Sequence, residues 1–212
     1  MVDLVIGAGE IGTAIQAIFN SDVIGRDMVA PKDDYDLLHI CFPYSNEFID
    51  QVERYQSKYR ARYTIIHSTV PLGVNRKLRG VASPCRGIHP NLEKGIRTFP
   101  KILAGQDASL VADYFRKAGL KVILYDEPEA GEAAKLFDTE YYRHCIEFAK
   151  EVKEYCMKHN LNYSEVYTIP NITYNEGYKE LGHPEYQRPV LQPIMTDIGG
   201  HCLLPNQKLL KL

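Results

Sequence analysis

Three glycines near the amino terminus have the spacing of a phosphate-binding turn. Gly7, Gly9 and Gly12 form a G-x-G-x-x-G pattern directly after an apolar run, Val2 to Ile6. The first glycine of such a pattern permits a tight turn, the second lets the backbone approach a pyrophosphate, and the third lets a helix pack closely on a strand. A helix beginning here directs unpaired N–H groups and a positive dipole end at an anion. The pattern therefore predicts a pyrophosphate-binding turn.

An acidic residue follows at the distance expected of a ribose ligand. Asp27 comes twenty residues after Gly7, where an acid hydrogen-bonds the hydroxyls of an adenosine ribose. A carboxylate there repels the 2′-phosphate of NADP, although the adjacent Arg26 is the residue type that binds such a phosphate. We therefore expect NAD rather than NADP, with Arg26 and Asp27 at the ribose and the backbone of Glu10 and Ile11 at the phosphates.

The elements that would position this turn alternate along the first part of the chain. Strand-like apolar runs occupy 2–6, 22–25, 37–42, 63–67, 101–104 and 121–125, and helical spacing occupies 10–20, 47–59 and 108–118. Such alternation implies a parallel sheet with right-handed crossovers. Residues 130–159 are one continuous stretch of helix formers. The sequence predicts an α/β fold: a Rossmann-type, doubly wound, mostly parallel sheet in a dinucleotide-binding domain, residues 1–126, followed by a smaller α-helical domain, residues 127–212.

The bulk composition argues against several classes of function. A net charge of −2 gives no basic face for nucleic acid, and the longest apolar runs are far shorter than the ~20 residues that cross a bilayer. The five cysteines are scattered without a C-x-x-C pair, so neither a disulfide framework nor a metal site is expected. Met1 leads almost directly into a strand, without the pattern of a signal peptide. We expect a cytoplasmic protein without membrane or nucleic-acid partners.

Four motifs occur in a characteristic order along the chain. They are Cys41-Phe42-Pro43, Ser68-Thr69-Val70-Pro71-Leu72-Gly73, Glu132-Ala133-Ala134-Lys135-Leu136 and Gly199-Gly200-His201-Cys202. In this order they resemble elements of the UDP-glucose/GDP-mannose dehydrogenases, which belong to the wider 6-phosphogluconate dehydrogenase-like group. The resemblance spans nearly the whole chain.

The resemblance implies roles for particular residues. In that family a cysteine attacks a sugar aldehyde, and NAD oxidises the resulting adduct. Carried over, Cys202 is the nucleophile, Lys135 stabilises an oxyanion, and Thr69 positions a water, while Pro43, Ser68 and Thr69 line the cofactor site. A thiolate and a buried ammonium suit these two tasks. The alternatives are an inert buried thiol and a solvated helix lysine.

This chain also departs from the family at positions that matter for proton transfer. Thr139 stands where the family has asparagine, Asn206 where it has aspartate, and Cys85 where it has glutamate. Loss of two carboxylates removes the groups best suited to activating water, although Asn206 remains a candidate catalytic residue. The family continues into a further domain that binds the nucleotide of the sugar substrate, whereas this chain ends at Leu212. We therefore expect a small polar, anionic substrate rather than an ordinary UDP-sugar.

Two further segments supply candidate substrate ligands. Arg86 and His89 lie in a loop that resembles the G-x-H-P loop of prephenate dehydrogenases, where arginine could clamp a carboxylate and histidine could exchange a proton. Asn175 and Tyr178 lie in a second polar segment, and His201 precedes Cys202. The competing interpretation is a solvated loop and ordinary tyrosine packing.

Three functions fit these patterns. The first is an NAD-dependent oxidoreductase of the nucleotide-sugar/hydroxyacid dehydrogenase type. The second is a non-redox nucleotide-binding protein or catalytically retired relative, and the third is a transferase that binds S-adenosylmethionine at the same turn. Relatives dimerise through a long helix like 130–159, and a helical domain this small covers little surface by itself, so we also expect a homodimer through the helical domain.

Overall fold

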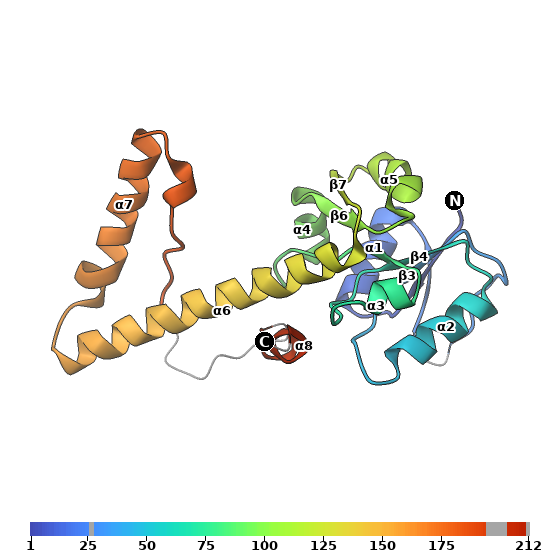
Figure 1. The fold of residues 1–212 in the computed structure, drawn as a ribbon, viewed down its shortest axis with the longest axis horizontal. Helices are drawn as coiled ribbons and strands as arrows, with labels where there is room; N and C mark the ends of the chain where they lie inside the picture. The colour runs from blue at the N-terminus through green and yellow to red at the C-terminus, as the bar shows by residue number, and fades with distance from the viewer. Residues whose placement is uncertain (26–27, 194–202, 211–212) are drawn as a thin grey trace. The chain divides into compact units, whose positions relative to one another are not determined.

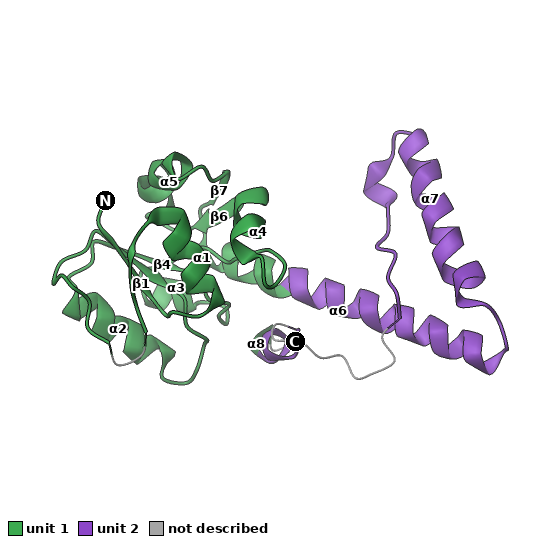
Figure 2. Cartoon of the chain, turned by 180° about the vertical axis from the view of Figure 1, so that it is seen from behind, with its two compact units in different colours: residues 1–136, 209–212 green, residues 137–208 purple. Residues whose placement is uncertain are grey.

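The computed structural model describes residues 1–25, 28–193 and 203–210. The chain divides into two compact units (Figure 2): residues 1–136 with 209–212 form unit 1, and residues 137–208 form unit 2. This division falls inside a long helix, whereas the domain boundary predicted at 126/127 precedes that helix. The boundary of independently folding domains stays a prediction.

Unit 1 is built on a sheet that has seven strands among the described residues. The strands are β1 (Asp3–Ile6), β2 (Asp22–Ile24), β3 (Leu37–Ile40), β4 (Tyr63–Ile66), β5 (Val81–Ala82), β6 (Lys101–Ala104) and β7 (Val122–Tyr125). Their order is β2-β1-β3-β4-β5-β6-β7, and every neighbouring pair is parallel except β5 and β6, which pair at Ala82 and Ala104. The predicted fold class, a Rossmann-type, mostly parallel α/β sheet followed by a helical region, is confirmed.

Helices cover both faces of this sheet (Figure 1). One face packs against α1 (Glu10–Phe19), α4 (Leu92–Thr98) and α5 (Ala108–Lys117). The other packs against α2 (Phe48–Lys58) and the single-turn α3 (Val74–Lys77). The central strands are buried on both faces, which is why they read as continuous apolar runs in the sequence.

Three elements of unit 1 have no counterpart among the expected ones: α3, β5 and α4. β5 has two residues and α3 has four, too few for a period of 2 or 3.6 to be visible in the sequence. Their positions are set by contacts with neighbouring elements, as the pairing of β5 with both β4 and β6 shows.

Unit 2 consists of helices around a small core. α6 (Pro128–Lys158) begins in unit 1, and a π-helical turn (Ser164–Thr168), α7 (Ile169–Glu180), a 3-10 turn (Pro184–Tyr186) and α8 (Leu203–Leu210) follow. Its core cluster has the buried residues Ala149, Cys156, Tyr163 and Tyr167. None of the described helices is both long and apolar enough to cross a membrane.

The apolar stripe that the sequence places on α6 is largely exposed in the single chain. Phe137, Tyr141 and Phe148 are 53%, 61% and 57% exposed. Cys145, next to this stripe, is half-buried, whereas Cys41 and Cys156 are buried. The residues buried on α6 lie elsewhere around the helix, so the stripe is a surface of unit 2.

Candidate functional site

The three glycines of the turn have different surroundings. Gly7 has φ +109°, and a Cβ there would lie 2.9 Å from the carbonyl carbon of Cys41. At Gly12 a Cβ would lie 1.6 Å from the carbonyl oxygen of Gly7. A Cβ at Gly9 meets no atom within 4 Å. At Gly7 and Gly12 other protein atoms therefore fill the space that a side chain would need, whereas the space in front of Gly9 is open.

A pocket of about 900 Å³ lies beside this turn. The sheet order reverses between β1 and β3, and ligands of open α/β sheets bind at the carboxyl ends of the strands at such a point. The pocket walls come from the segments after β1, β2 and β3 and from α2. They include Ile6, Gly7, Ala8, Gly9, Gly25, Cys41, Phe42, Pro43, Gln51, Arg54, Tyr55 and Lys58. The pocket thus occupies the topological switch point of the sheet.

These residues fit a dinucleotide. The space in front of Gly9 lies at the amino terminus of α1, where Gly9 is the N-cap and no side chain caps the helix. Free N–H groups at that end bind phosphate oxygens. Arg54 and Lys58 add positive charge to the wall of the pocket. Arg26 and Asp27, the predicted ribose ligands, lie outside the described residues.

The α2 wall of the pocket is a feature that the sequence reasoning missed. Gln51, Arg54, Tyr55 and Lys58 have the spacing i, i+3, i+4 and i+7, which places them on one face of a helix. The helical spacing of 47–59 follows from the opposite, apolar face, of which Phe48 and Val52 are buried. The polar face is the signal that could have identified the wall.

The other predicted cofactor ligands lie around the same edge of the sheet. Pro43 lines the pocket. The hydroxyl of Ser68 donates to the carbonyl oxygen of Phe42 at 2.6 Å, so this residue joins the ends of β3 and β4. Glu10, in the first turn of α1, pairs with His89, and Ile11 packs against the core under α1. Ser68 therefore supports the pocket wall from behind.

Two of the predicted catalytic residues come together in unit 1. Thr69 and Lys135 both line a recess of about 10 Å³, with Ser68, Pro84 and Glu132 among its other walls. Lys135 is half-buried, and a space of this size holds about one water molecule. The recess lies between the loop after β4 and the beginning of α6, so Lys135 and Thr69 border the same small space.

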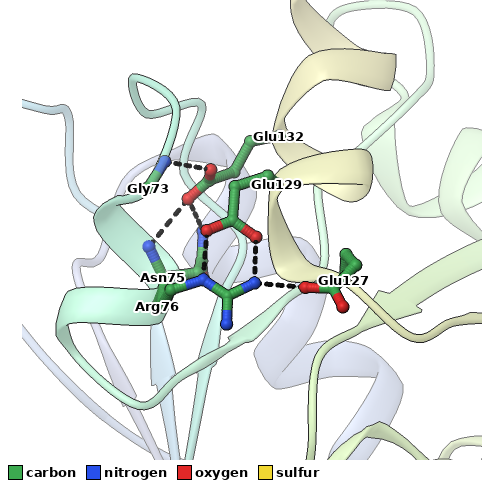
Figure 3. Close-up of polar contacts among 6 residues, drawn as sticks. All are labelled: Gly73, Asn75, Arg76, Glu127, Glu129 and Glu132. Carbon is green, nitrogen blue, oxygen red and sulfur yellow. Dashed lines mark hydrogen bonds and ion pairs between the residues drawn. The ribbon is translucent and has the colours of Figure 1, made fainter.

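Glu132 fixes the loop that carries Thr69 (Figure 3). Its carboxylate accepts hydrogen bonds from the backbone N–H groups of Gly73 and Asn75, at 2.5 and 2.7 Å, and from the Asn75 side-chain amide at 2.8 Å. Glu132 is only 3% exposed. A buried carboxylate is stable when several donors surround it, and these donors belong to the start of α3. Glu132 thereby ties this turn to α6, one helical turn before Lys135.

A second link on the same side of the molecule is exposed. Arg76 of α3 forms a bidentate ion pair with Glu129 of α6, at 2.5 and 2.7 Å, and also contacts Glu127. The contact with Arg76 holds the pKa of Glu129 below its ordinary value. Exposed pairs contribute less than buried ones, so Glu132 is the main anchor between α3 and α6.

Behind the pocket, a row of polar side chains crosses the buried sheet. The Nδ1 atom of His67 lies 3.0 Å from the carbonyl oxygen of Ser83, and its Nε2 lies 2.9 Å from the Nδ1 of His39. A carbonyl only accepts, so the hydrogen of His67 is on Nδ1, and His39 donates to Nε2. The Nε2 of His39 lies 3.6 Å from Asp3, whose carboxylate accepts from Tyr114 at 2.6 Å.

Burial determines the charge of this row. It lowers the pKa of His39 and, helped by the nearby Lys101 ammonium, lowers the pKa of His67 well below its ordinary value. For Asp3, burial acts to raise the pKa, but its contacts with His39, Tyr114 and Ser21 bring it below its ordinary value. The two imidazoles are thus neutral at pH 7, and the carboxylate is ionised. His39 is fully buried within this row.

The predicted substrate residues of unit 1 are held by protein contacts. Arg86 donates to the carbonyl oxygen of Pro100 at 2.8 Å, and its guanidinium lies over the ring of Phe99. His89 is exposed and pairs with Glu10 at the start of α1. Neither residue lines the pocket beside the glycine turn or the recess of Lys135. Their role in substrate binding stays a prediction.

In unit 2, the predicted substrate residues shape the segment around α7. The Asn175 side chain accepts from the backbone N–H of Arg188 at 2.8 Å and donates to its carbonyl oxygen at 2.9 Å. Tyr178 packs against the rings of Tyr174 and Tyr186. These contacts close the turn after α7, and a role for Asn175 and Tyr178 toward substrate stays a prediction.

Two positions at which the chain departs from the resembled family contact one another in unit 2. The buried side chain of Asn206 lies 3.4 Å from the hydroxyl of Thr139. Thr139 is one turn beyond Lys135 on α6. His201 and Cys202 lie outside the described residues. Across the described part of the chain, no three histidine, cysteine or acidic side chains are grouped as metal ligands.

Comparison with known proteins places the fold among dehydrogenases. No family model and no curated protein matches the sequence. The UDP-D-ManNAc dehydrogenase of Pyrococcus horikoshii superposes with a TM-score of 0.74 at 16% identity, over 99% of this chain and 64% of its own. The NDP-N-acetyl-D-galactosaminuronic acid dehydrogenase of Methanosarcina mazei gives a TM-score of 0.71 at 17% identity, over 99% and 60%.

A smaller dehydrogenase also matches. The 3-hydroxyisobutyrate dehydrogenase of Mycobacterium tuberculosis gives a TM-score of 0.60 at 16% identity, over 80% of this chain and 70% of its own. The chain spans less than two thirds of the two nucleotide-sugar enzymes that it matches. At these identities the comparison establishes architecture. The chain has the fold shared by UDP-sugar dehydrogenases and 3-hydroxyacid dehydrogenase-like proteins.

Proposed function

We propose that the chain is a nicotinamide-dinucleotide-dependent oxidoreductase of the nucleotide-sugar/hydroxyacid dehydrogenase type, acting on a small polar, anionic substrate. The observation that carries the proposal is the contrast within the glycine turn. The protein itself fills the space at Gly7 and Gly12, whereas the space at Gly9 is open toward a large pocket. Such a space is needed when a backbone must approach a pyrophosphate.

The proposed cofactor is NAD, with Asp27 hydrogen-bonded to the ribose. When bound, its nicotinamide ring supplies hydride transfer. The backbone N–H groups at the start of α1 bind the phosphates, and Arg54 and Lys58 add positive charge beside them. The substrate's reacting oxygen lies near Lys135, whose ammonium stabilises negative charge there, while Thr69 holds a polar atom in the same recess. Cys202 is the proposed nucleophile if the oxidation passes through an aldehyde.

The first test separates binding from folding. In a Gly9→Val variant the Cβ meets no protein atom within 4 Å, so we expect the chain to fold, whereas the side chain occupies the space proposed for the pyrophosphate. We expect calorimetric titration with NAD to show at least a tenfold loss of affinity with an unchanged melting temperature. A Gly177→Ala variant, also open at its Cβ but on α7, is the matched control and should bind like the wild type. Equal NAD affinity in Gly9→Val would contradict the proposal.

The second test addresses chemistry. Lys135→Ala should abolish hydride transfer across a panel of 2- and 3-hydroxy acids and nucleotide sugars, while leaving NAD affinity within about twofold, because Lys135 does not line the pocket of the glycine turn. Absorbance of the reduced nicotinamide follows the reaction. Unchanged turnover in this variant would remove Lys135 from the mechanism.

A second candidate function has an observation of its own. Asn206 and Thr139 pair through an amide and a hydroxyl, and neither group transfers protons at neutral pH. This pair favours a non-redox dinucleotide-binding protein. NAD binding without reduction across the whole substrate panel would support it, and any turnover that depends on Lys135 would exclude it. Competition between NAD and S-adenosylmethionine separates both candidates from a transferase.

The assembly proposed for this function is a homodimer through unit 2. Phe137, Tyr141 and Phe148 leave an apolar face of α6 exposed, and α7 has no buried residue of its own. Large exposed apolar patches mark interaction surfaces, and a second copy is the proposed cover. Sedimentation velocity at micromolar concentration should show a dimer, and Tyr141→Lys with Phe148→Lys should give a monomer.

The proposed compartment is the cytoplasm, where the described cysteines stay as free thiols.

A further inference from the structure

The buried thiol of Cys85 lies against a buried lysine. The Nζ atom of Lys101 is 3.0 Å from the Sγ of Cys85, and the two residues are 3% and 7% exposed. The same nitrogen donates to the carbonyl oxygens of Ser83 at 2.7 Å and Pro84 at 3.0 Å. Lys101 belongs to β6, and Cys85 follows β5. The two strands therefore hold an amine and a thiol in contact inside the protein.

The number of hydrogen bonds indicates how protons are shared in this pair. A neutral amine has two N–H groups, whereas an ammonium has three. Lys101 has three acceptors within hydrogen-bonding distance, two carbonyls and one sulfur, so the ammonium satisfies them all. A buried ammonium needs acceptors around it, and the two carbonyl oxygens and the sulfur of Cys85 supply them. Burial lowers the pKa of Lys101, which makes the ammonium a ready proton donor.

Cys41 provides a comparison within the same molecule. It belongs to the same hydrophobic cluster as Cys85 and is equally exposed, at 7%. Among the described residues no lysine hydrogen-bonds its thiol, and burial raises its pKa well above the ordinary value, although the charge of Lys101 acts in the opposite direction. Because the thiolate is the form that reacts with oxidants, Cys85 and Cys41 should differ in reactivity although they are equally accessible.

We propose that Cys85 and Lys101 form a peroxide-modification site, at which oxidised Cys85 is captured by Lys101 as a covalent sulfur–nitrogen crosslink. The thiolate attacks hydrogen peroxide, an S–O bond forms as the O–O bond breaks, and the Lys101 ammonium gives its proton to the leaving hydroxide. This step produces a sulfenic acid, water and a neutral amine. The amine then attacks the sulfur, the S–O bond breaks, and a second water leaves with a proton from the nitrogen.

The two steps balance without a further reactant. One hydrogen peroxide is reduced to two waters, the sulfur is oxidised by two electrons, and the protein loses two hydrogen atoms. Pro84, whose carbonyl binds Lys101, also lines the recess of Thr69 and Lys135. The crosslink would join the ends of β5 and β6 next to that recess and would protect the thiol from irreversible oxidation. The inference is independent of the proposed function.

The test uses the wild-type chain treated with hydrogen peroxide and mapped by tryptic mass spectrometry. Linkage blocks cleavage after Lys101, so we expect a branched product of residues 80–86 and 98–116, lighter than the sum of the two peptides by two hydrogens. Cys41 should remain unmodified at the same peroxide dose. Oxidation of Cys41 as fast as Cys85, or conversion of Cys85 to a sulfinic acid without a crosslink, would overturn the proposal.

Two further measurements separate the charge of Lys101 from its nucleophilicity. In Lys101→Arg the cation remains but the attacking amine is absent, so Cys85 should still oxidise and its sulfenic acid should be trapped by dimedone, without a crosslink. Should this buried substitution prevent folding, peroxide treatment of the wild-type chain in denaturant replaces it. There the difference between Cys85 and Cys41 should disappear, since both thiols lose their folded surroundings. Persistence of the difference in denaturant would contradict a role for Lys101.

Discussion

The two compact units bury their side chains very differently. In unit 1, helices cover both faces of the sheet, and strands such as β1 and β3 are buried along their whole length. In unit 2, the core cluster has four buried residues, and α7 has none. Large aromatic residues such as Tyr141 and Tyr155 are more than half exposed there.

The difference teaches which parts of the molecule determine their own structure. Within unit 1 even polar groups are buried, and many of them contact one another, as His39 and His67 do. The glycine turn and the recess of Lys135 rest on this rigid support, as sites built on regular elements do. In the described part of unit 2, large apolar side chains such as Phe148 are exposed. We expect substitutions to be costly in unit 1 and mild in unit 2.

The largest effect is expected from Gly12→Ala. The new Cβ would lie 1.6 Å from the carbonyl oxygen of Gly7, and neither α1 nor the turn can move without disturbing the buried β1. We expect a loss of at least about 3 kcal/mol in the free energy of unfolding, measured by urea denaturation with circular dichroism. Gly9→Ala is the matched control in the same turn and should lie within about 0.5 kcal/mol of the wild type. Equal losses of stability in the two variants would show that the packing of α1 on β1 does not explain the need for glycine at position 12.

A somewhat smaller loss is expected from Glu132→Ala. This change leaves the backbone N–H groups of Gly73 and Asn75 without their carboxylate acceptor in a buried place, which costs about 2 to 3 kcal/mol. It should also loosen the loop of Thr69, so hydrogen exchange should accelerate at residues 69–75. Glu129→Ala, which removes a half-buried partner of the exposed Arg76, is the control and should change stability much less. A larger loss from Glu129→Ala would refute the assignment of the anchor.

Whether a feature of the fold or of the candidate site could be predicted from the sequence depends on its length and on how far apart its residues lie in the chain. The Gly7-to-Gly12 turn and strands such as 37–40 could be predicted from the sequence because their patterns are local and regular. The Glu132 contacts with Gly73 and Asn75 join residues almost sixty positions apart, and the Cys85–Lys101 pair depends on how β5 and β6 meet. No periodicity encodes such contacts. The motif containing Glu132 was recognised, but its hydrogen-bonding role required the structure.

The next prediction concerns the buried imidazoles. Burial sets the pKa of His67 in the folded state well below its ordinary value, whereas the unfolded chain has a pKa of about 6.5. Between these values the unfolded chain binds more protons, so the free energy of unfolding falls as the pH drops below about 6.5 and is unaffected by this group at higher pH. The melting temperature measured from pH 8 to pH 5 should follow this trend.

A variant identifies the group responsible. His67→Gln keeps a donor for Ser83 and an acceptor for His39 but does not titrate, so its stability should depend less steeply on pH over the same range. Asp3, whose pKa lies below its ordinary value, adds a loss only at much lower pH, below about 4. The two windows are therefore separate. An unchanged pH slope in His67→Gln would assign the effect to other groups.

The smallest effect, and the one of opposite sign, is expected from Gly177→Ala in unit 2. Gly177 lies within α7, and its Cβ would meet no atom within 4 Å. The same substitution that is excluded at Gly12 should therefore stabilise α7 by about 0.5 to 1 kcal/mol, because alanine loses less backbone entropy than glycine on forming a helix. Hydrogen exchange should slow in α7 and stay unchanged in the sheet of unit 1. Slower exchange in both units would mean that they unfold as one cooperative body, in which case the thin core of unit 2 would be sustained by unit 1 rather than by a second copy of the chain.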